Sequence, residues 1–377
     1  MSIAKQYAVS PAVQAMSAYQ AGKPIEDLAR EFNLDPNEII KLASNENPLG
    51  YSDKVQKALH GLLDGSERQA LGRYPDANGF ALKQALSEHY GVASDWITLG
   101  NGSNDLLELV SLALLNEHTS CVYSQYAFVV YRLSTQARGA RHIQVPAKNF
   151  GHNLEAMFEA IEEDTRLVFI ANPNNPTGTF HSGQVIEDFV ARVFEKYGLK
   201  VTVVLDEAYN EYLDPELRFN SAALVNKYPN LVVLRTFSKA YGLAAIRVGF
   251  AIARPALTDF FNRVRQPFNV NSFAQVAAQA ALQDTEFLQR TYELNKQGKE
   301  MLSQAFTELG LSFVPSYGNF ILVKVPDALV VNQELLRKGV IVRPVVGDGL
   351  PEHLRVSIGL PHENQRFIEA LTEVLTQ

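Results

Sequence analysis

The chain has 377 residues and a formal net charge of −7, from 34 Lys and Arg against 41 Asp and Glu. Because there is no basic surplus to neutralise phosphates, we expect no general affinity for nucleic acid or for an anionic membrane. Hydrophobic residues make up 46% of the chain and charged residues 20%, a composition typical of a soluble globular protein. The length predicts a large core domain with a smaller companion.

The N-terminal residues and the cysteine content bound the location and the chemistry. Residues 1–5 lack the apolar stretch of a signal peptide, and no apolar run approaches the roughly 20 residues that span a bilayer, so we expect a cytoplasmic protein. Cys121 is the single cysteine, which rules out an internal disulfide and is interpreted as a buried structural thiol. The eight histidines show no metal-ligand spacing, so no metal site is expected.

Short apolar runs alternate with helix-length amphipathic segments in the first part of the chain. The runs are 96–99, 120–123, 142–145, 167–171, 201–205, 231–234 and 248–252. This alternation predicts an α/β layer on a largely parallel sheet, and runs that are apolar on both faces indicate strands covered on both sides. We therefore predict a large domain over residues 50–270.

The pattern changes after about residue 270. A long helical region, 272–310, is followed by strand-like segments at 319–325, 340–343 and 354–358 and a helical segment at 332–338. This α+β pattern predicts a small C-terminal domain over residues 271–377, with residues 1–49 as an N-terminal arm that forms part of it.

Chemically distinctive residues follow four of the predicted strands, at the edge where open α/β sheets bind ligands. The first cluster, 100–105, leads into a helix expected near Leu106 and is rich in small residues that let backbone N–H groups approach a phosphate. The others are a polar loop, 172–178, the acidic segment 206–209, and a lysine flanked by hydroxyls in 235–247. Each cluster alone also fits a structural role, as a turn, a helix cap or a salt bridge.

Together, the order Asn-Pro-x-Asn-Pro-Thr-Gly, Asp-Glu-Ala-Tyr, Ser-Lys-x-x-Gly-Leu and Arg-x-Gly resembles the fold-type I aminotransferases over nearly the full chain. The resemblance implies an α/β transferase with a mostly parallel central sheet covered by helices, a smaller α+β domain, and pyridoxal 5′-phosphate as the cofactor. It implies that Lys239 is the Schiff-base lysine that also moves a proton, and that Asp206 keeps the pyridine nitrogen protonated. Asn175 and Tyr209 would hydrogen-bond the phenolic oxygen of the cofactor.

The same resemblance implies the remaining cofactor contacts. The phosphate would be held at the helix start, by hydroxyls and by a guanidinium: Ser103, Asn104, Thr236, Ser238 and Arg247. Phe128 would stack on the ring of the cofactor, and Tyr126 is the competing candidate. The sequence departs from the family pattern at Tyr126, where many relatives carry a proline. Tyr74 would reach into the neighbouring subunit and touch the phosphate there, so the resemblance also implies a homodimer.

Three segments, 19–24, 40–50 and 72–76, resemble the opening of the histidinol-phosphate aminotransferases. In that family Arg355 would bind the acid group of the substrate, and Arg343 and Tyr19 would add contacts to a substrate phosphate. Asn47 lies in the arm that closes over the substrate. The implied reaction transfers the amino group of L-glutamate to imidazole acetol phosphate, and it produces L-histidinol phosphate and 2-oxoglutarate.

Three alternatives remain open from the sequence. An aromatic amino acid aminotransferase has the same scaffold, because relatives of this type accept phenylalanine or tyrosine. A lyase similar to the phosphothreonine decarboxylases would also bind a phosphorylated amine. A pyridoxal-phosphate-sensing regulator would carry an added DNA-binding segment, and the family-like arm that begins by about Tyr19 leaves no room for one.

Overall fold

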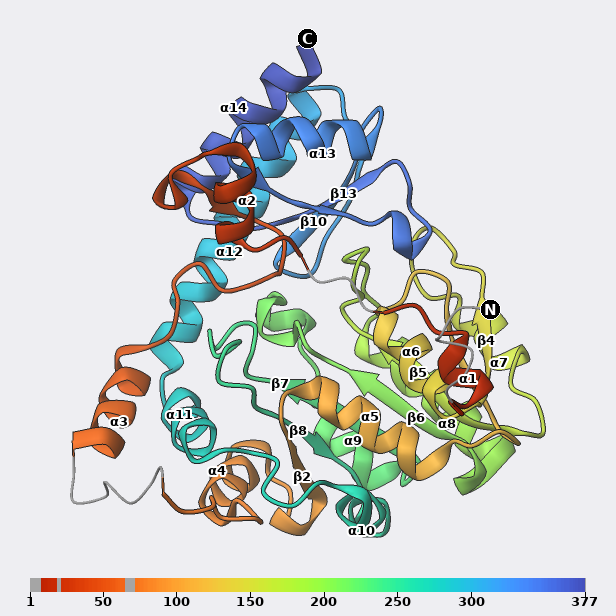
Figure 1. Cartoon of the computed structure of the whole chain (residues 1–377). Helices are drawn as coiled ribbons and strands as arrows, with labels where there is room; N and C mark the ends of the chain where they lie inside the picture. The colour runs from red at the N-terminus through yellow and green to blue at the C-terminus, as the bar shows by residue number, and fades with distance from the viewer. Residues whose placement is uncertain (1–7, 19–21, 65–71, 377) are drawn as a thin grey trace.

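A seven-stranded sheet lies at the centre of the computed structural model, which describes residues 8–18, 22–64 and 72–376. The strand order is β2-β8-β7-β6-β5-β3-β4 (Figure 1). The strands are β2 (Ile97–Gly100), β3 (Ser120–Ser124), β4 (Arg141–Val145), β5 (Thr165–Ala171), β6 (Thr202–Asp206), β7 (Leu231–Thr236) and β8 (Gly249–Ile252). β8 is antiparallel to both of its neighbours and the other pairs are parallel, which confirms the predicted, largely parallel sheet.

The burial of β4 differs from the prediction that the strands are covered on both sides. β2, β3, β6, β7 and β8 are buried at every position, whereas Arg141, His142 and Gln144 of β4 are exposed. β4 is the last strand of the sheet and pairs only with β3, so part of its surface faces solvent. Cys121 of β3 is buried, as predicted.

Helices cover both faces of this sheet, as expected for a doubly covered α/β layer. On one face the core is built with α5 (Ser103–Leu114), α6 (Val129–Ala137) and α10 (Pro255–Val264). On the other face it is built with α3 (Asp53–Asp64), α4 (Phe80–Tyr90), α7 (Leu154–Glu159), α8 (Gly183–Tyr197), α9 (Ser221–Lys227) and α11 (Ser272–Leu282). The fold class expected from the sequence is therefore confirmed.

A second, antiparallel sheet has the strand order β12-β13-β10-β9. Its strands are β9 (Phe313–Val314), β10 (Phe320–Lys324), β12 (Arg343–Pro344) and β13 (His353–Ser357). The helices α12 (Thr285–Glu308), α13 (Ala328–Arg337) and α14 (Pro361–Thr376) pack around it and share one core with it (Figure 1). The short helices α1 (Pro11–Gln14) and α2 (Ile25–Phe32) precede β1 (Ile40–Lys41), which pairs in parallel with β11 (Val340–Ile341).

Two details bear on the predicted domain boundaries. The helical region expected over 272–310 is two helices, because the Asp284 side chain accepts the Phe287 N–H at 3.2 Å and starts α12 anew. α11 lies beyond residue 270, and its Ala274 and Ala278 are buried in the core of the seven-stranded sheet. The division of the chain at residues 49 and 270 stays a prediction.

Within the described ranges, none of the helices is both long and apolar enough to cross a membrane.

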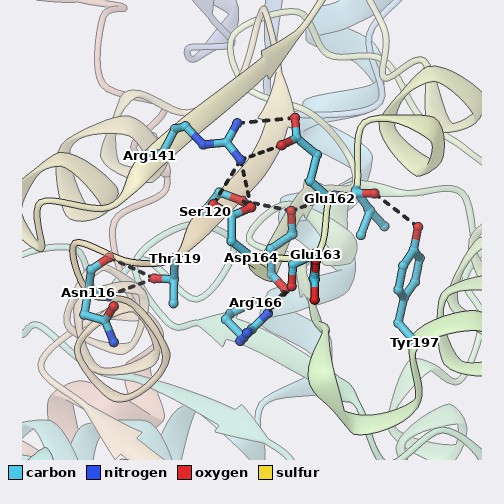
Figure 2. Close-up of polar contacts among 11 residues, drawn as sticks. Asn116, Thr119, Ser120, Arg141, Glu162, Glu163, Asp164, Arg166 and Tyr197 are labelled. Atoms are coloured by element: carbon cyan, nitrogen blue, oxygen red, sulfur yellow. Dashed lines mark hydrogen bonds and ion pairs between the residues drawn. The ribbon is translucent and has the colours of Figure 1, made fainter.

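Ion pairs join neighbouring strands of the large sheet, both near the N-terminal ends of the strands and near their carboxyl ends. At the N-terminal ends of β3, β4 and β5, the Arg141 guanidinium donates to Glu162 and to Asp164, at 2.7 Å in each case, and Asp164 accepts from the Ser120 hydroxyl at 3.0 Å (Figure 2). The Arg141 side chain is 48% exposed. Solvent therefore screens this network.

A second arginine lies deep in the sheet, on β7. Arg235 is 7% exposed and pairs with Glu207 at 2.7 Å and with Glu211 at 3.0 Å. Burial raises the pKa of the Glu207 carboxyl, and the charge of Arg235 opposes that rise. Since Glu207 is 0% exposed, its charge depends on this partner.

We expect Arg235→Leu to lower the free energy of unfolding by about 3–5 kcal/mol, because it leaves the Glu207 charge buried without its partner. Arg141→Leu, the matched change at the exposed network, should cost about 1 kcal/mol or less. Urea unfolding followed by circular dichroism measures both values. Equal losses for the two variants would contradict the difference in burial.

Candidate active site

A cavity of about 480 Å³ opens beside the carboxyl ends of β5, β6 and β7. Its volume lies in the range that holds a small-molecule ligand. Most of the side chains predicted from the sequence line it: Ser103, Asn104, Phe128, Asn175, Asp206, Tyr209, Thr236, Ser238, Lys239, Arg247, Arg343 and Arg355. The structure thus brings together residues from both sheets.

The first turn of α5 forms one wall of the cavity. The helix begins at Ser103, three residues before the expected start at Leu106, because Gly102 caps it with φ 86° and the Asp105 carboxylate accepts the Asn101 N–H at 2.8 Å. A Cβ atom at residue 102 would lie 2.5 Å from Nη2 of Arg247, so glycine is needed for this close approach. The helix N-terminus and the guanidinium together favour an anion.

Arg247 is held in an unusual backbone conformation, with φ 62°. Left-handed backbone is uncommon for residues other than glycine and clusters at functional sites. Its Nη1 donates to the Ala244 carbonyl at 2.9 Å and to the Ser238 hydroxyl at 3.4 Å. The Ser238 N–H in turn donates to the Thr236 hydroxyl at 3.1 Å. Two hydroxyls and a guanidinium therefore face the helix start, an arrangement that suits a phosphate group.

Asp206 ends β6 at the base of the cavity and is 5% exposed. Its Oδ2 accepts a hydrogen bond from the Tyr131 hydroxyl at 2.8 Å. Its Oδ1 is buried and has no partner among the described residues. Burial raises the pKa of Asp206 to about 6, and the Tyr131 hydroxyl and the Ala208 N–H oppose that rise. The carboxylate can therefore accept one more donor from a bound molecule.

Lys239 follows β7 and its Nζ donates to the Ser44 carbonyl at 3.0 Å. Burial, and then the positive charge of Arg355, lower its pKa to about 8. A lysine with this pKa is partly neutral near physiological pH, so it can act as a nucleophile and as a base. The Tyr209 ring lies 6.0 Å from Nζ, and the Tyr209 hydroxyl accepts from the Asn45 side chain at 3.0 Å.

Two arginines of the small sheet face each other at the cavity. Arg343 of β12 and Arg355 of β13 are directly paired in register. Like charges in directly opposed positions of a sheet are destabilising. Arg355 donates to the Asn175 side-chain oxygen and to the Ala43 carbonyl, at 2.6 Å in each case. We interpret the pair as a site for an anion.

The two aromatic candidates for stacking are separated by the structure. Phe128 lines the cavity directly before α6. Tyr126 instead stacks on Phe150, with ring centroids 6.0 Å apart. This placement favours Phe128, whose role stays a prediction.

Asn47 and Tyr74 are not among the described residues that line the cavity. Asn47 is buried beside a separate, smaller cavity, and its amide donates to the Ala240 carbonyl at 2.8 Å and to the Thr291 hydroxyl at 3.0 Å. Tyr74 is 80% exposed and stacks on Phe268 at 4.6 Å. Tyr19 lies outside the described residues.

Sequence reasoning missed several residues of the site: Ser44, Asn45, Tyr131 and Asp348. Tyr131 contacts Asp206 from a position 75 residues away in the chain, and no local pattern indicates that contact. Ser44 and Asn45 lie within a segment that the sequence singled out only for its resemblance to a family. In the described parts of the chain, no group of three or more His, Cys, Asp and Glu side chains is arranged to hold a metal ion.

The whole chain is similar to known aminotransferases. The model of the family "Aminotransferase class I and II" matches residues 37–371. The chain belongs to this aminotransferase family. "Histidinol-phosphate aminotransferase 1" of Cupriavidus pinatubonensis is 58% identical over 367 residues, which cover 96% of this chain and 95% of the relative. "Histidinol-phosphate aminotransferase 2" of Ralstonia nicotianae is 56% identical over 369 residues, with 97% and 96% covered.

A solved structure agrees with this assignment. The crystal structure of histidinol-phosphate aminotransferase from Sinorhizobium meliloti in complex with pyridoxal-5′-phosphate has 26% sequence identity and a TM-score of 0.87, and the match covers 98% of each chain. The aminotransferase described here therefore has the family fold over nearly its whole length.

For this aminotransferase we expect the reactivity of Lys239 toward acetic anhydride to be half-maximal at about pH 8, because only the neutral amine reacts and its pKa is about 8. Arg355→Gln removes a nearby positive charge, so it should move the midpoint to higher pH. Competitive labelling read by mass spectrometry measures both proteins. A wild-type midpoint close to the ordinary lysine value of 10.5 would contradict the burial of this amine.

Proposed function

We propose that the chain is a pyridoxal-phosphate-dependent histidinol-phosphate aminotransferase. It transfers the amino group of L-glutamate to imidazole acetol phosphate and forms L-histidinol phosphate and 2-oxoglutarate. Relatives of that name are 56–58% identical over nearly the full chain, which supports the assignment. The structural observation that carries it is the opposed pair Arg343 and Arg355 at the wall of the cavity that contains Lys239.

The residues of the cavity fit pyridoxal phosphate. The buried Asp206 Oδ1, which has no partner within the described residues, suits a protonated ring nitrogen. Ser103, Asn104, Thr236, Ser238 and Arg247 would hold the phosphate. Phe128 would cover the ring, and Asn175 and Tyr209 would contact the phenolic oxygen. When bound, this cofactor supplies a carbonyl carbon that bonds to amines and a protonated ring that accepts an electron pair.

Lys239 has the properties of the group that moves the proton. Its Nζ lies in the cavity and its pKa of about 8 leaves part of it neutral near physiological pH. The neutral Nζ can take a proton from one reacting carbon, and the ammonium that forms can return a proton to the other within the same half reaction. Arg355 contributes to this balance, because its charge favours the neutral amine.

The arginine pair suits both substrates. Glutamate carries a side-chain carboxylate and histidinol phosphate carries a phosphate, and each presents oxygens that a guanidinium binds in a bidentate manner. Arg355 would bind either anion, and Arg343, with Tyr19, would add contacts to the phosphate. Phenylalanine carries an α-carboxylate but no phosphate, so it would not use the phosphate contacts of Arg343.

We also propose a homodimer and a cytoplasmic location. Tyr74 and Phe268 form a stacked aromatic pair. Tyr74 is 80% exposed and Phe268 is 40% exposed, and Phe80, nearby in the chain, is 66% exposed. Exposed apolar groups that gather on one surface are typical of an interface. Tyr74 would reach from this surface into the cavity of the neighbouring subunit, and Asn47 would support the arm that closes over the substrate.

The absorbance spectrum of the protein loaded with pyridoxal phosphate tests the function. We expect glutamate and histidinol phosphate to convert the pyridoxal band to the pyridoxamine form, histidinol phosphate far more efficiently than phenylalanine, and Lys239→Ala to abolish conversion. A preference for phenylalanine would overturn the substrate assignment. A protein that binds no pyridoxal phosphate would overturn the whole proposal.

In the same assay, Arg343→Gln should lower the efficiency with histidinol phosphate by about tenfold to a hundredfold, since it removes a hydrogen bond between charged groups. The efficiency with phenylalanine should change much less. Arg141→Gln, at the opposite edge of the sheet, is the matched control and should leave both values unchanged. Equal losses with the two substrates would argue against a phosphate contact for Arg343.

Mixed dimers test the predicted role of Tyr74. The intact protein should sediment at twice 41.8 kDa. Tyr74→Ala should bind pyridoxal phosphate more weakly, because a contact to the phosphate is lost. In a hybrid of a Tyr74→Ala subunit with a Lys239→Ala subunit, the only site with a lysine receives its tyrosine from the other subunit, so normal affinity should return. A hybrid as weak as the Tyr74→Ala homodimer would show that the residue acts within its own subunit, and a homodimer with normal affinity would show that it makes no such contact.

A further inference from the structure

Tyr131 is a buried tyrosine whose hydroxyl contacts a predicted catalytic residue. It lies in the first turn of α6, is 0% exposed, and lines the cavity. Its hydroxyl donates to Oδ2 of Asp206 at 2.8 Å. The contact joins a helix on one face of the sheet to the carboxyl end of β6.

The ring of Tyr131 is fixed by its neighbours. It stacks on Phe169 of β5, with ring centroids 4.5 Å apart and an interplanar angle of 8°. The Phe128 ring meets it edge-on at 6.0 Å, with an interplanar angle of 88°. Since a tyrosine side chain has only two rotatable bonds to its ring, these contacts leave the hydroxyl in one position. Tyr131 therefore links the aromatic wall of the cavity to Asp206.

The two oxygens of Asp206 differ because of this contact. Oδ2 is occupied by the Tyr131 hydroxyl, whereas Oδ1 is buried and lacks a partner among the described residues. The fixed phenol holds the orientation of the carboxylate group, so that one oxygen stays directed to a ligand.

The contact also acts on the charge of the carboxylate. Burial raises the pKa of Asp206 to about 6, while the hydrogen bonds from Tyr131 and from the Ala208 N–H lower it. Burial, and then the charge of Asp206, raise the pKa of Tyr131 well above 10, so the phenol stays protonated and remains a donor. Tyr209 is the other titratable group that acts on Tyr131, and it too raises the pKa of the phenol.

We propose that Tyr131 is a positioning residue for Asp206: its hydroxyl holds Oδ2, directs Oδ1 to the ring nitrogen of the cofactor, and favours the charged carboxylate. This inference rests on the proposed function, since it takes pyridoxal phosphate as the ligand of the cavity. It differs from a purely structural role, in which the hydroxyl would only satisfy a buried polar group.

Tyr131→Phe removes the one hydroxyl and keeps the stacked ring. The measurement is the dissociation constant of pyridoxal phosphate for the cofactor-free protein, by equilibrium dialysis across a range of pH. Loss of a donor to a charged group should raise the pKa of Asp206 by about one to two pH units. As the pH is lowered, the affinity of the variant for pyridoxal phosphate should therefore begin to fall at a higher pH than the affinity of the wild type. The dissociation constant should rise by about tenfold near pH 6, where about half of the wild-type Asp206 is charged and much less of it is charged in the variant.

Two further variants separate positioning from stability. Tyr123→Phe removes a hydroxyl that bonds His142 at 3.0 Å on the neighbouring strand, so it should lower thermal stability and leave the pH profile of cofactor affinity unchanged. In an Asp206→Asn background, Tyr131→Phe should have no further effect on affinity, because the hydroxyl acts through the carboxylate. 3-Fluorotyrosine at position 131, a stronger donor of the same shape, should move the profile to lower pH.

The outcomes are distinct. A Tyr131→Phe protein that unfolds like Tyr123→Phe and has the wild-type affinity profile would overturn the proposal, as would an equal effect of Tyr131→Phe with and without the Asp206 carboxylate. If Tyr131→Phe does not fold, a 3-fluorotyrosine protein with an unshifted profile overturns it. A wild-type protein that binds no pyridoxal phosphate would overturn the proposed function instead, so the two failures are distinguishable.

Discussion

Two consecutive buried carboxylates at the end of β6 constrain the rest of the site. Asp206 is 5% exposed and Glu207 is 0% exposed. Side chains of successive residues in extended chain point to opposite sides, so the two charges need partners from different elements. Asp206 takes Tyr131 from α6, and Glu207 takes Arg235 from β7 and the Ser221 hydroxyl, at 2.6 Å, from α9. The contacts of α6, β7 and α9 with the end of β6 therefore compensate the burial of these two carboxylates.

The N-terminal arm joins the two sheets at the cavity. The Asn45 side chain donates to the Tyr209 hydroxyl and accepts from the Ser357 hydroxyl of β13, at 3.0 and 2.9 Å. Its neighbours supply backbone carbonyls to the two cations, Ser44 to Lys239 and Ala43 to Arg355. A short piece of arm thus fixes a tyrosine, a lysine and an arginine that come from distant parts of the chain. This explains why the arm carries a recognisable pattern although it forms little regular structure.

The sequence predicts the site well where a residue is tied to the end of a strand. Asp206 and Lys239 follow apolar runs whose carboxyl ends meet at one edge of a parallel sheet, so the pattern of strands is enough to bring them together. Tyr131 could not be found in this way, because the rotation of α6 on the sheet decides which of its side chains faces β6. The role of Tyr74 could not be tested either, because its predicted contact lies in another subunit. The exposure of β4 could not be predicted, because it depends on the place of this strand at the edge of the sheet.

The neutral partners of Arg355 fit its proposed role of binding two anionic substrates in turn. Two of the acceptors that hold its guanidinium are the amide oxygen of Asn175 and the carbonyl of Ala43. A carboxylate or phosphate brings a full negative charge to the guanidinium and can accept two of its N–H groups in a bidentate manner, which a single amide or carbonyl oxygen does not. An incoming anion can therefore displace a neutral acceptor, which a protein carboxylate in the same place would resist. The opposed Arg343 adds a second reason, because an anion close to both guanidinium groups adds to the negative charge that Asp348 already places near them. The site is thus oriented before the substrate binds and still open to exchange.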